Sequence, residues 1–181
     1  GDPSVTGGLL KEIGGLWPWG SGRVTLPIDG GLLFMPQRPY LPEGTLREAL
    51  WYPQPADGCT DAELHFALER VGLASLLPRL DEGDNWDQAL PLRAQQQLGF
   101  ARALVQRPDW IFMEGATDAF DPEGEQQILQ MLHEALPGAT LLVISFHPGL
   151  EPLHDRTLVL ERVAQSKFLF EGRRTNGGAN H

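Results

Sequence analysis

Short continuous apolar runs alternate along the chain with stretches in which apolar residues recur every three or four positions. The continuous runs cover residues 31–35, 109–113 and 140–146, and such runs predict strands that are buried on both faces of a sheet. Two further strands are predicted at residues 157–160 and 167–170. Buried strands that alternate with helices are typical of an α/β layer fold with a mostly parallel sheet.

The periodic stretches predict helices, and the residues at their ends predict where those helices start and stop. The sequence TDAE at residues 60–63 is a capping box, in which a hydroxyl and a carboxylate satisfy the first free amides of a helix that Gly72 closes. A second helix is predicted at about 92–106. Asp121 is expected to cap a third helix, and a short helix is predicted within residues 7–16.

Length and composition limit the classes of protein that the chain could be. Its 181 residues predict one domain, over residues 1–172, followed by a polar, frayed end at 173–181. There are 24 acidic and 14 basic residues, without a basic cluster, so we expect no nucleic-acid partner. No apolar run approaches the roughly 20 residues of a membrane span. The single cysteine, Cys59, excludes an internal disulfide.

Candidate chemistry is sought where strands end, because ligands of parallel α/β sheets bind at the carboxyl ends of the strands. These places are the loops that follow Met35, Met113 and Phe146. The histidines of the chain show no metal-ligand spacing, so no metal cluster is predicted from them.

Five segments in these regions resemble, in order, one known family, the ATPase domain of ABC transporters. The subgroup that they resemble contains the peroxisomal fatty-acyl transporters and their bacterial relatives. The segments are GLWPWGSGR at 15–23, FMPQRPYLPEGTLREAL at 34–50, QQQLGFARAL at 95–104, RPDWIFM at 107–113 and ATDAFD at 116–121. The resemblance implies a P-loop NTPase-like layered fold with a helical subdomain at about 45–105.

The phosphate-binding loop of that family reads G-x-x-x-x-G-K-[ST], in which lysine neutralises phosphate and the hydroxyl binds magnesium. The matching part of this chain is GDPSVTGG at residues 1–8. Counting back without gaps from the resembling segment that begins at Gly15 puts Thr6 at the lysine position and Gly7 at the hydroxyl position, with Gly8 after it. A charged hydrogen bond contributes about 1.5–3 kcal/mol, so we expect the loss of the lysine to weaken nucleotide binding roughly ten- to hundredfold.

This chain also lacks characteristic residues of two other family motifs. The signature loop of the family reads L-S-G-G-[EQ], whereas residues 90–94 here read LPLRA, so a proline removes an amide donor and both glycines are missing. After the Walker B strand the family has aspartate and then glutamate, and this chain has Glu114 and Gly115. Glu114 could reach magnesium through water. Gly115 cannot act as a general base, and the absence of such a base typically costs ~10²–10⁴ in rate.

Three other residues match functional positions of the family, each with a simpler alternative. Gln37 matches the glutamine that contacts magnesium and the attacking water and relays to the membrane domain; its alternative is a surface loop residue. His147 matches the switch histidine if one residue is deleted; its alternative is a histidine at a strand end without a catalytic task. Asp121 matches the D-loop aspartate, but its role as a helix cap explains it sufficiently.

The resemblance also implies strands ahead of residue 1 that the chain lacks, so we expect a fragment of a longer protein, or a sheet whose edges pair elsewhere. Three functional hypotheses follow. The first is a degenerate nucleotide-binding domain that binds ATP and magnesium weakly or not at all, and docks through its Q-loop surface. Its partners would be a membrane domain and a second nucleotide-binding domain, in the cytoplasm at a membrane. The second is a working ATPase subunit completed by a partner. The third is an inactive fold remnant or altered fragment.

Overall fold

The computed structural model describes residue 25 and residues 31–55, 58–144, 150, 153–163 and 167–174. The chain forms two compact units, Ile28–Val143 and the pair of segments Gly1–Pro27 and Ile144–His181. The helix predicted within residues 7–16 lies outside the described residues.

A three-stranded sheet with the order β1-β4-β5 organises the larger unit. Strand β1 (Leu32–Pro36) runs parallel to β4 (Trp110–Glu114), in a register that ends with Pro36 opposite Glu114. Strand β5 (Thr140–Ile144) lies on the other side of β4. The predicted strands at 31–35 and 109–113 are therefore confirmed, each shifted by one residue, while residues 145–146 of the third lie outside the described part.

The prediction that β1 is buried on both faces is wrong. Leu33 and Met35 are buried, but Leu32 is 36% exposed and Phe34 is 39% exposed. The reason is the position of β1, which lies at the edge of the sheet among the strands that the structure describes, so that Phe34 stacks on Phe112 of its one neighbouring strand, with ring centroids 5.0 Å apart. An apolar run therefore predicted the strand but not its place in the sheet.

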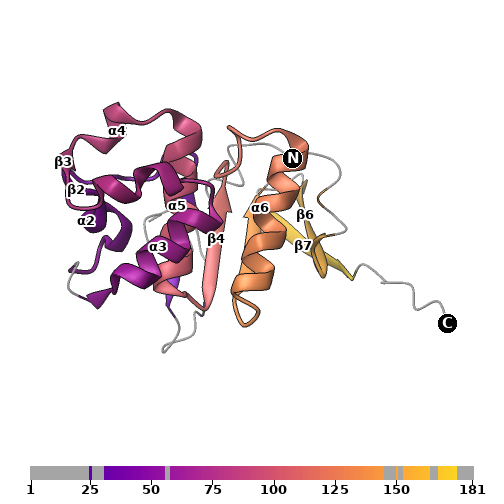
Figure 1. Ribbon diagram of the computed structural model, residues 1–181. Coiled ribbons are helices and arrows are strands. Elements are labelled where there is room, and N and C mark those ends of the chain that lie inside the picture. The colour runs from indigo at the N-terminus through magenta and orange to yellow at the C-terminus, as the bar shows by residue number, and fades with distance from the viewer. Residues whose placement is uncertain are drawn as a thin grey trace. The chain divides into compact units, whose positions relative to one another are not determined.

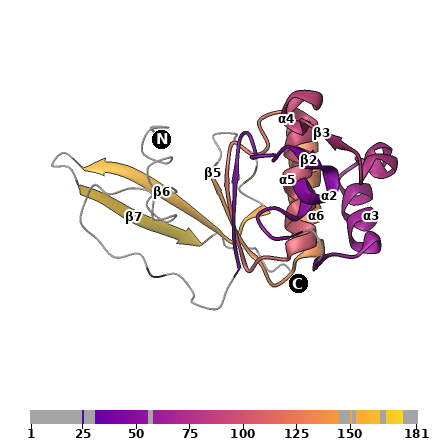
Figure 2. The same cartoon turned by 90° about the vertical axis from the view of Figure 1, so that its left-hand side faces the viewer.

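Helices α5 and α6 lie on one side of this sheet (Figure 2). The helices of the unit are α2 (Leu46–Trp51), α3 (Asp61–Arg70), the 3₁₀ helix η2 (Ala74–Arg79), α4 (Trp86–Ala89), α5 (Leu92–Gln106) and α6 (Pro122–Ala135). The strand face that carries Leu33 and Met35 packs toward α5, where the methyl group of Met35 lies 3.4 Å from the position that a Cβ on Gly99 would take. A glycine at this point lets helix and sheet approach closely.

The predicted helix ends are confirmed. The hydroxyl of Thr60 accepts from the amide of Glu63, and the Glu63 carboxylate accepts from the amide of Thr60, which is the predicted capping box of α3. Gly72, just after α3, has a φ of +80°, a conformation that glycine adopts without strain. Helix α5 has the predicted bounds. Asp121 caps α6 by accepting from the amide of Gly124 at 3.2 Å.

A small antiparallel pair, β2 (Gly44–Thr45) with β3 (Gly83–Asp84), joins the start of α2 to the segment before α4. The fully buried Trp86 strengthens this junction because its indole Nε1 donates to the carbonyl of Gly44 at 2.9 Å. The residues just before α2 are therefore held both by the β2–β3 pairing and by the hydrogen bond from Trp86.

The smaller unit contains an antiparallel hairpin of β6 (Arg156–Val163) and β7 (Lys167–Arg174), shown in yellow in Figure 1. Both strands were predicted, and both are longer than the predicted segments. The expected frayed end at 173–181 is wrong at its first two residues. The reason is backbone pairing, because Arg174 lies opposite Arg156 and Arg173 opposite Thr157 in the ladder.

Candidate functional site

The carboxyl ends of β1 and β4 place two of the predicted site residues side by side. Because Pro36 lies opposite Glu114 in the register, the next residues, Gln37 and Gly115, emerge together at this edge of the sheet. Glu114 is half-buried and Gln37 is exposed. The loops that follow these two strands therefore start next to each other.

Gln37 has a specific partner that the sequence did not predict. Its side-chain Nε2 donates to the carboxylate Oδ2 of Asp118 at 2.7 Å, across 81 positions of the chain. Gly115 lies against both groups. A Cβ at position 115 would be 2.9 Å from Asp118 Oδ2 and 3.2 Å from Gln37 Cβ, and the φ of Gly115 is +65°.

The backbone around this pair is fastened by Gln96, a side chain on α5 that is 2% exposed. Its Nε2 donates to the carbonyl of Gln37 at 2.9 Å and to the carbonyl of Gly115 at 3.1 Å. Its Oε1 accepts from the amide of Ala119 at 3.1 Å. One buried amide group therefore connects α5 with two loops, residues 37–43 (the 37–43 loop) and residues 115–120 (the 115–120 loop).

Other contacts hold the 115–120 loop against the helices. The hydroxyl of Thr117 donates to the carboxylate of Glu125 at 2.6 Å, and both residues are buried. The Phe120 ring meets Phe100 edge to face, with centroids 6.0 Å apart. The guanidinium of Arg93 stacks over the same Phe120 ring, 4.7 Å from its centroid. The start of α5 and the loop are thus packed together.

The segment that resembles the signature loop leads directly into α5. Pro91 is the cap residue of that helix, and it makes no side-chain cap hydrogen bond. The preceding turn is secured instead by Gln95, which donates through Nε2 to the carbonyls of Asp87 at 2.7 Å and Leu90 at 2.8 Å. The start of α5 therefore combines a proline with an exposed arginine, Arg93, at the second helical position.

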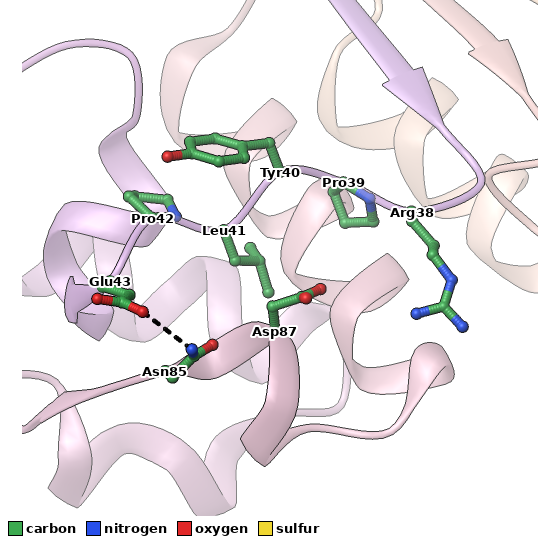
Figure 3. Close-up of a pocket in the computed structure, with 8 residues that line it drawn as sticks. All are labelled: Arg38, Pro39, Tyr40, Leu41, Pro42, Glu43, Asn85 and Asp87. Carbon is green, nitrogen blue, oxygen red and sulfur yellow. Dashed lines mark hydrogen bonds between the residues drawn. The ribbon is translucent and has the colours of Figure 1, made fainter.

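The 37–43 loop borders an open surface pocket of about 700 Å³ (Figure 3). In Figure 3, Glu43 and Asn85 face each other at one end of the pocket, where Asn85 Nδ2 donates to Glu43 Oε1 at 3.1 Å, and Arg38 lies at the other end. The pocket is lined by Arg38, Pro39, Tyr40, Leu41, Pro42, Glu43, Asn85 and Asp87. Tyr40 is 63% exposed, so this surface offers an aromatic ring together with charges of both signs.

Arg102, a buried arginine on α5, binds the backbone of the 37–43 loop. Its Nη2 donates to the carbonyl of Tyr40 at 3.0 Å and to that of Ala49 at 2.6 Å, and its Nε donates to Ala49 at 3.2 Å. Its guanidinium also lies 5.6 Å from the ring centroid of Tyr52, which packs on Tyr40. Burial lowers the pKa of Arg102 to about 10, so the group remains a cation at neutral pH.

The other predicted site residues are distributed as follows. Asp121 lies at the start of α6, where its carboxylate acts as the helix cap. Thr6, Gly7, Gly8 and His147 lie outside the described residues. The oxygen atoms of Gln37 and Glu114 are of the kind that magnesium binds. Within the described ranges, no three histidine, cysteine, aspartate or glutamate side chains form a group that could hold a metal ion.

Sequence reasoning missed three residues that shape the site, Gln96, Arg102 and Asp118. The first two are polar residues within an apolar helix stripe, a pattern that can signal a buried hydrogen-bonding role. Asp118 had no such signal, because its partner is distant in the chain. Each helix that the structure describes is too short or too polar to cross a membrane.

Comparison with known proteins identifies relatives along most of the chain. An uncharacterized ABC transporter ATP-binding protein of Haemophilus influenzae is 34% identical over 161 residues, covering 89% of this chain and 27% of the relative. The mouse lysosomal cobalamin transporter is 34% identical over 166 residues, covering 84% of this chain and 27% of the transporter. The chain thus spans about a quarter of the length of these relatives. No family model matches it.

A solved structure gives the same result. A bacterial Atm1-family ABC exporter, determined with ATP bound, matches with a TM-score of 0.62 and 25% sequence identity, over 72% of this chain and 23% of the exporter chain. This likeness confirms the predicted P-loop NTPase-like α/β fold.

Proposed function

Because the chain belongs to the ABC transporter ATP-binding proteins, we propose that it is a degenerate nucleotide-binding domain that docks on a membrane domain and hydrolyses ATP negligibly. Its partners would be that membrane domain and a second nucleotide-binding domain. It would lie in the cytoplasm, at the membrane through its partner. ATP and magnesium would bind weakly or not at all.

The observation that carries this proposal is the backbone at position 115, where the family pattern has the glutamate that polarises the attacking water. Gly115 has a φ of +65°, and the space for a side chain is taken by the carboxylate of Asp118. Residues other than glycine adopt this conformation at a cost. The local backbone is therefore adapted to glycine, which supports a low hydrolysis rate, about 10²–10⁴ below that of an enzyme with a general base.

The start of α5 supports the same proposal. The family signature uses backbone amides, a serine and two glycines to bind the γ-phosphate of the partner's nucleotide. Here Pro91 has no amide hydrogen, and the bulky side chains of Leu92 and Arg93 replace the glycines. The stacking of Arg93 on Phe120 gives this arginine a contact within its own chain. The phosphate loop, read from sequence, adds Thr6 at the lysine position.

The docking role is supported by the pocket beside the 37–43 loop. It offers the exposed ring of Tyr40, the cation of Arg38 and the carboxylates of Glu43 and Asp87 to a partner. Tyrosine and arginine are among the residues enriched in protein interfaces. Arg102 holds the loop through the carbonyl of Tyr40, so a partner would meet a formed surface.

A second function, ATP hydrolysis completed by a partner subunit, is favoured by one observation. Gln37 and Glu114 keep adjacent positions at the sheet edge, where their oxygens could reach magnesium. In that case Gln37 Oε1 and the Glu114 carboxylate would hold the ion, which would neutralise phosphate charge when bound. A third reading, an inactive fold remnant, differs from the proposal in predicting no docking.

The test measures MgATP binding by calorimetry and phosphate release on the whole protein that carries this chain, together with its membrane domain. Weak binding without turnover is the expected result. Turnover of about 1 s⁻¹ or more that is lost in Glu114→Gln would contradict the proposal and favour the second function. Glu123→Gln, which changes an exposed carboxylate in the first turn of α6, is the matched control. Crosslinking of Tyr40→Cys to the membrane domain tests docking separately, and its absence would favour the remnant.

A further inference from the structure

We infer that Asp118 is a positioning residue that holds Gln37 from within the chain and so keeps the 37–43 loop in its docking shape without nucleotide. The inference rests on the proposed docking role of this loop. It starts from one contact, the hydrogen bond of 2.7 Å from Gln37 Nε2 to Asp118 Oδ2. A charged acceptor makes this bond stronger than one between neutral groups.

Gly115 and Asp118 depend on each other. A Cβ at position 115 would lie 2.9 Å from Asp118 Oδ2, closer than such atoms normally approach, and 3.2 Å from the Cβ of Gln37. A side chain at 115 would therefore displace the carboxylate from its place beside Gln37. The absence of a side chain at Gly115 thus allows the carboxylate of Asp118, in the 115–120 loop, to reach Gln37, the first residue of the 37–43 loop.

The backbone beneath this contact makes it a link between the two loops. Buried Gln96 binds the carbonyls of Gln37 and Gly115 and the amide of Ala119, so the backbone of both loops is anchored to α5 around the Gln37–Asp118 pair. With the backbone anchored, the side-chain bond determines where the amide group of Gln37 points. The carboxylate of Asp118 therefore orients this amide group without an external ligand.

The contact between Gln37 and Asp118 matters because the loop that it holds lines the pocket. Residues that follow Gln37 line the pocket, and Arg102 donates to the carbonyl of Tyr40, one of these lining residues. The 37–43 loop is therefore held at its start by Asp118 and Gln96, and in its middle by Arg102. All three partners belong to this chain, so the surface forms before any nucleotide or partner arrives.

The experiment is hydrogen–deuterium exchange with mass spectrometry on the whole protein in lipid nanodiscs, with and without MgATP. In the wild type, the five amides of residues 37–43, those other than the prolines at 39 and 42, are expected to exchange at the same rate in both conditions. Asp118→Ala should accelerate their exchange about two- to fivefold, as expected for the loss of one exposed hydrogen bond to a carboxylate. Asp118→Asn should have a smaller effect, because its amide oxygen still accepts from Gln37.

Two controls separate positioning from general destabilisation. Glu123→Ala removes another exposed carboxylate that accepts from a glutamine, Gln127, at 3.3 Å, and it should leave residues 37–43 unchanged. Peptides from α3 should also be unchanged in Asp118→Ala. In addition, Gln37→Ala should accelerate exchange as much as Asp118→Ala does, and the double variant should add nothing more.

The inference is overturned if Asp118→Ala has no larger effect than Glu123→Ala, if it accelerates α3 equally, or if the effects of Gln37→Ala and Asp118→Ala add. It is also overturned if MgATP slows residues 37–43 in the wild type as strongly as the Asp118 contact does. Rapid ATP turnover by the wild type would contradict the proposed function alone, because exchange in the nucleotide-free protein still tests the Asp118 link.

Discussion

Replacement of Gly115 by alanine tests whether the site is adapted to glycine at this position. The φ of +65° is costly for a residue with a Cβ, by about 1–2 kcal/mol. The new Cβ would also displace the Asp118 carboxylate, 2.9 Å away, and so break an exposed hydrogen bond to Gln37 that contributes about 0.5 kcal/mol. We therefore expect Gly115→Ala to lower the free energy of unfolding by about 2 kcal/mol.

The assay is urea unfolding followed by circular dichroism, with Asp118→Ser as the second variant. In the Asp118→Ser background the carboxylate is already absent, so Gly115→Ala should cost only the backbone share, about 1–2 kcal/mol. Gly115→Glu should destabilise more than Gly115→Ala, because one carboxylate would then face another. A cost below about 0.5 kcal/mol for Gly115→Ala, or a gain of ATP turnover in Gly115→Glu without loss of stability, would refute the reasoning.

Three further outcomes are expected from the same unfolding assay. Gln96→Leu should lower the free energy of unfolding by about 2–4 kcal/mol, because it leaves two carbonyls and one amide without their buried partner. A decrease of less than about 1 kcal/mol would contradict this expectation. Arg102→Met should cost about 1–3 kcal/mol, equally at about pH 6 and pH 8, because burial lowers the pKa of Arg102 only to about 10 and the guanidinium stays charged across this range; a pH-dependent cost would be evidence against it. Hydrogen bonds from the amide and hydroxyl of Thr60 lower the pKa of the Glu63 carboxyl, so this stabilisation is present above the usual pKa of 4.5 and is lost as pH falls through the lowered value. Wild type and Glu63→Gln should therefore differ at neutral pH and converge in acid, and a constant difference would contradict the capping role.

Helix boundaries could be predicted because their causes are local. The capping box at Thr60 and Glu63 and the cap at Asp121 act within three residues of each helix start, so neighbouring sequence letters determine them. Strand burial could not be predicted in this way. Phe34 is exposed because β1 lies at an edge of the described sheet, and the pairing of β1 with β4 joins residues more than 70 positions apart.

The candidate site could be predicted only in part. The general rule that parallel strands end at one edge was sufficient to bring Gln37 and Glu114 together. The contact of Gln37 with Asp118 was not predictable, since it depends on the backbone turn that Gly115 allows and on the register of the two strands. The resemblance to the family predicted that Gly115 takes the place of a general base, whereas the structure shows that this glycine leaves space for the Asp118 carboxylate.

Helix α5 contains buried polar side chains that would let the fold tolerate substitutions in the loops around it. Gln95, Gln96 and Arg102 are almost fully buried, and each donates to backbone carbonyls of other segments rather than to a side chain. Backbone carbonyls are present whatever side chain occupies a position, so substitutions in the loops leave these bonds intact. Removal of a donor from α5, in contrast, leaves buried carbonyls without partners. The fold is therefore expected to tolerate changes at residues such as Arg93 and Glu114 far better than changes at these three buried polar residues of α5.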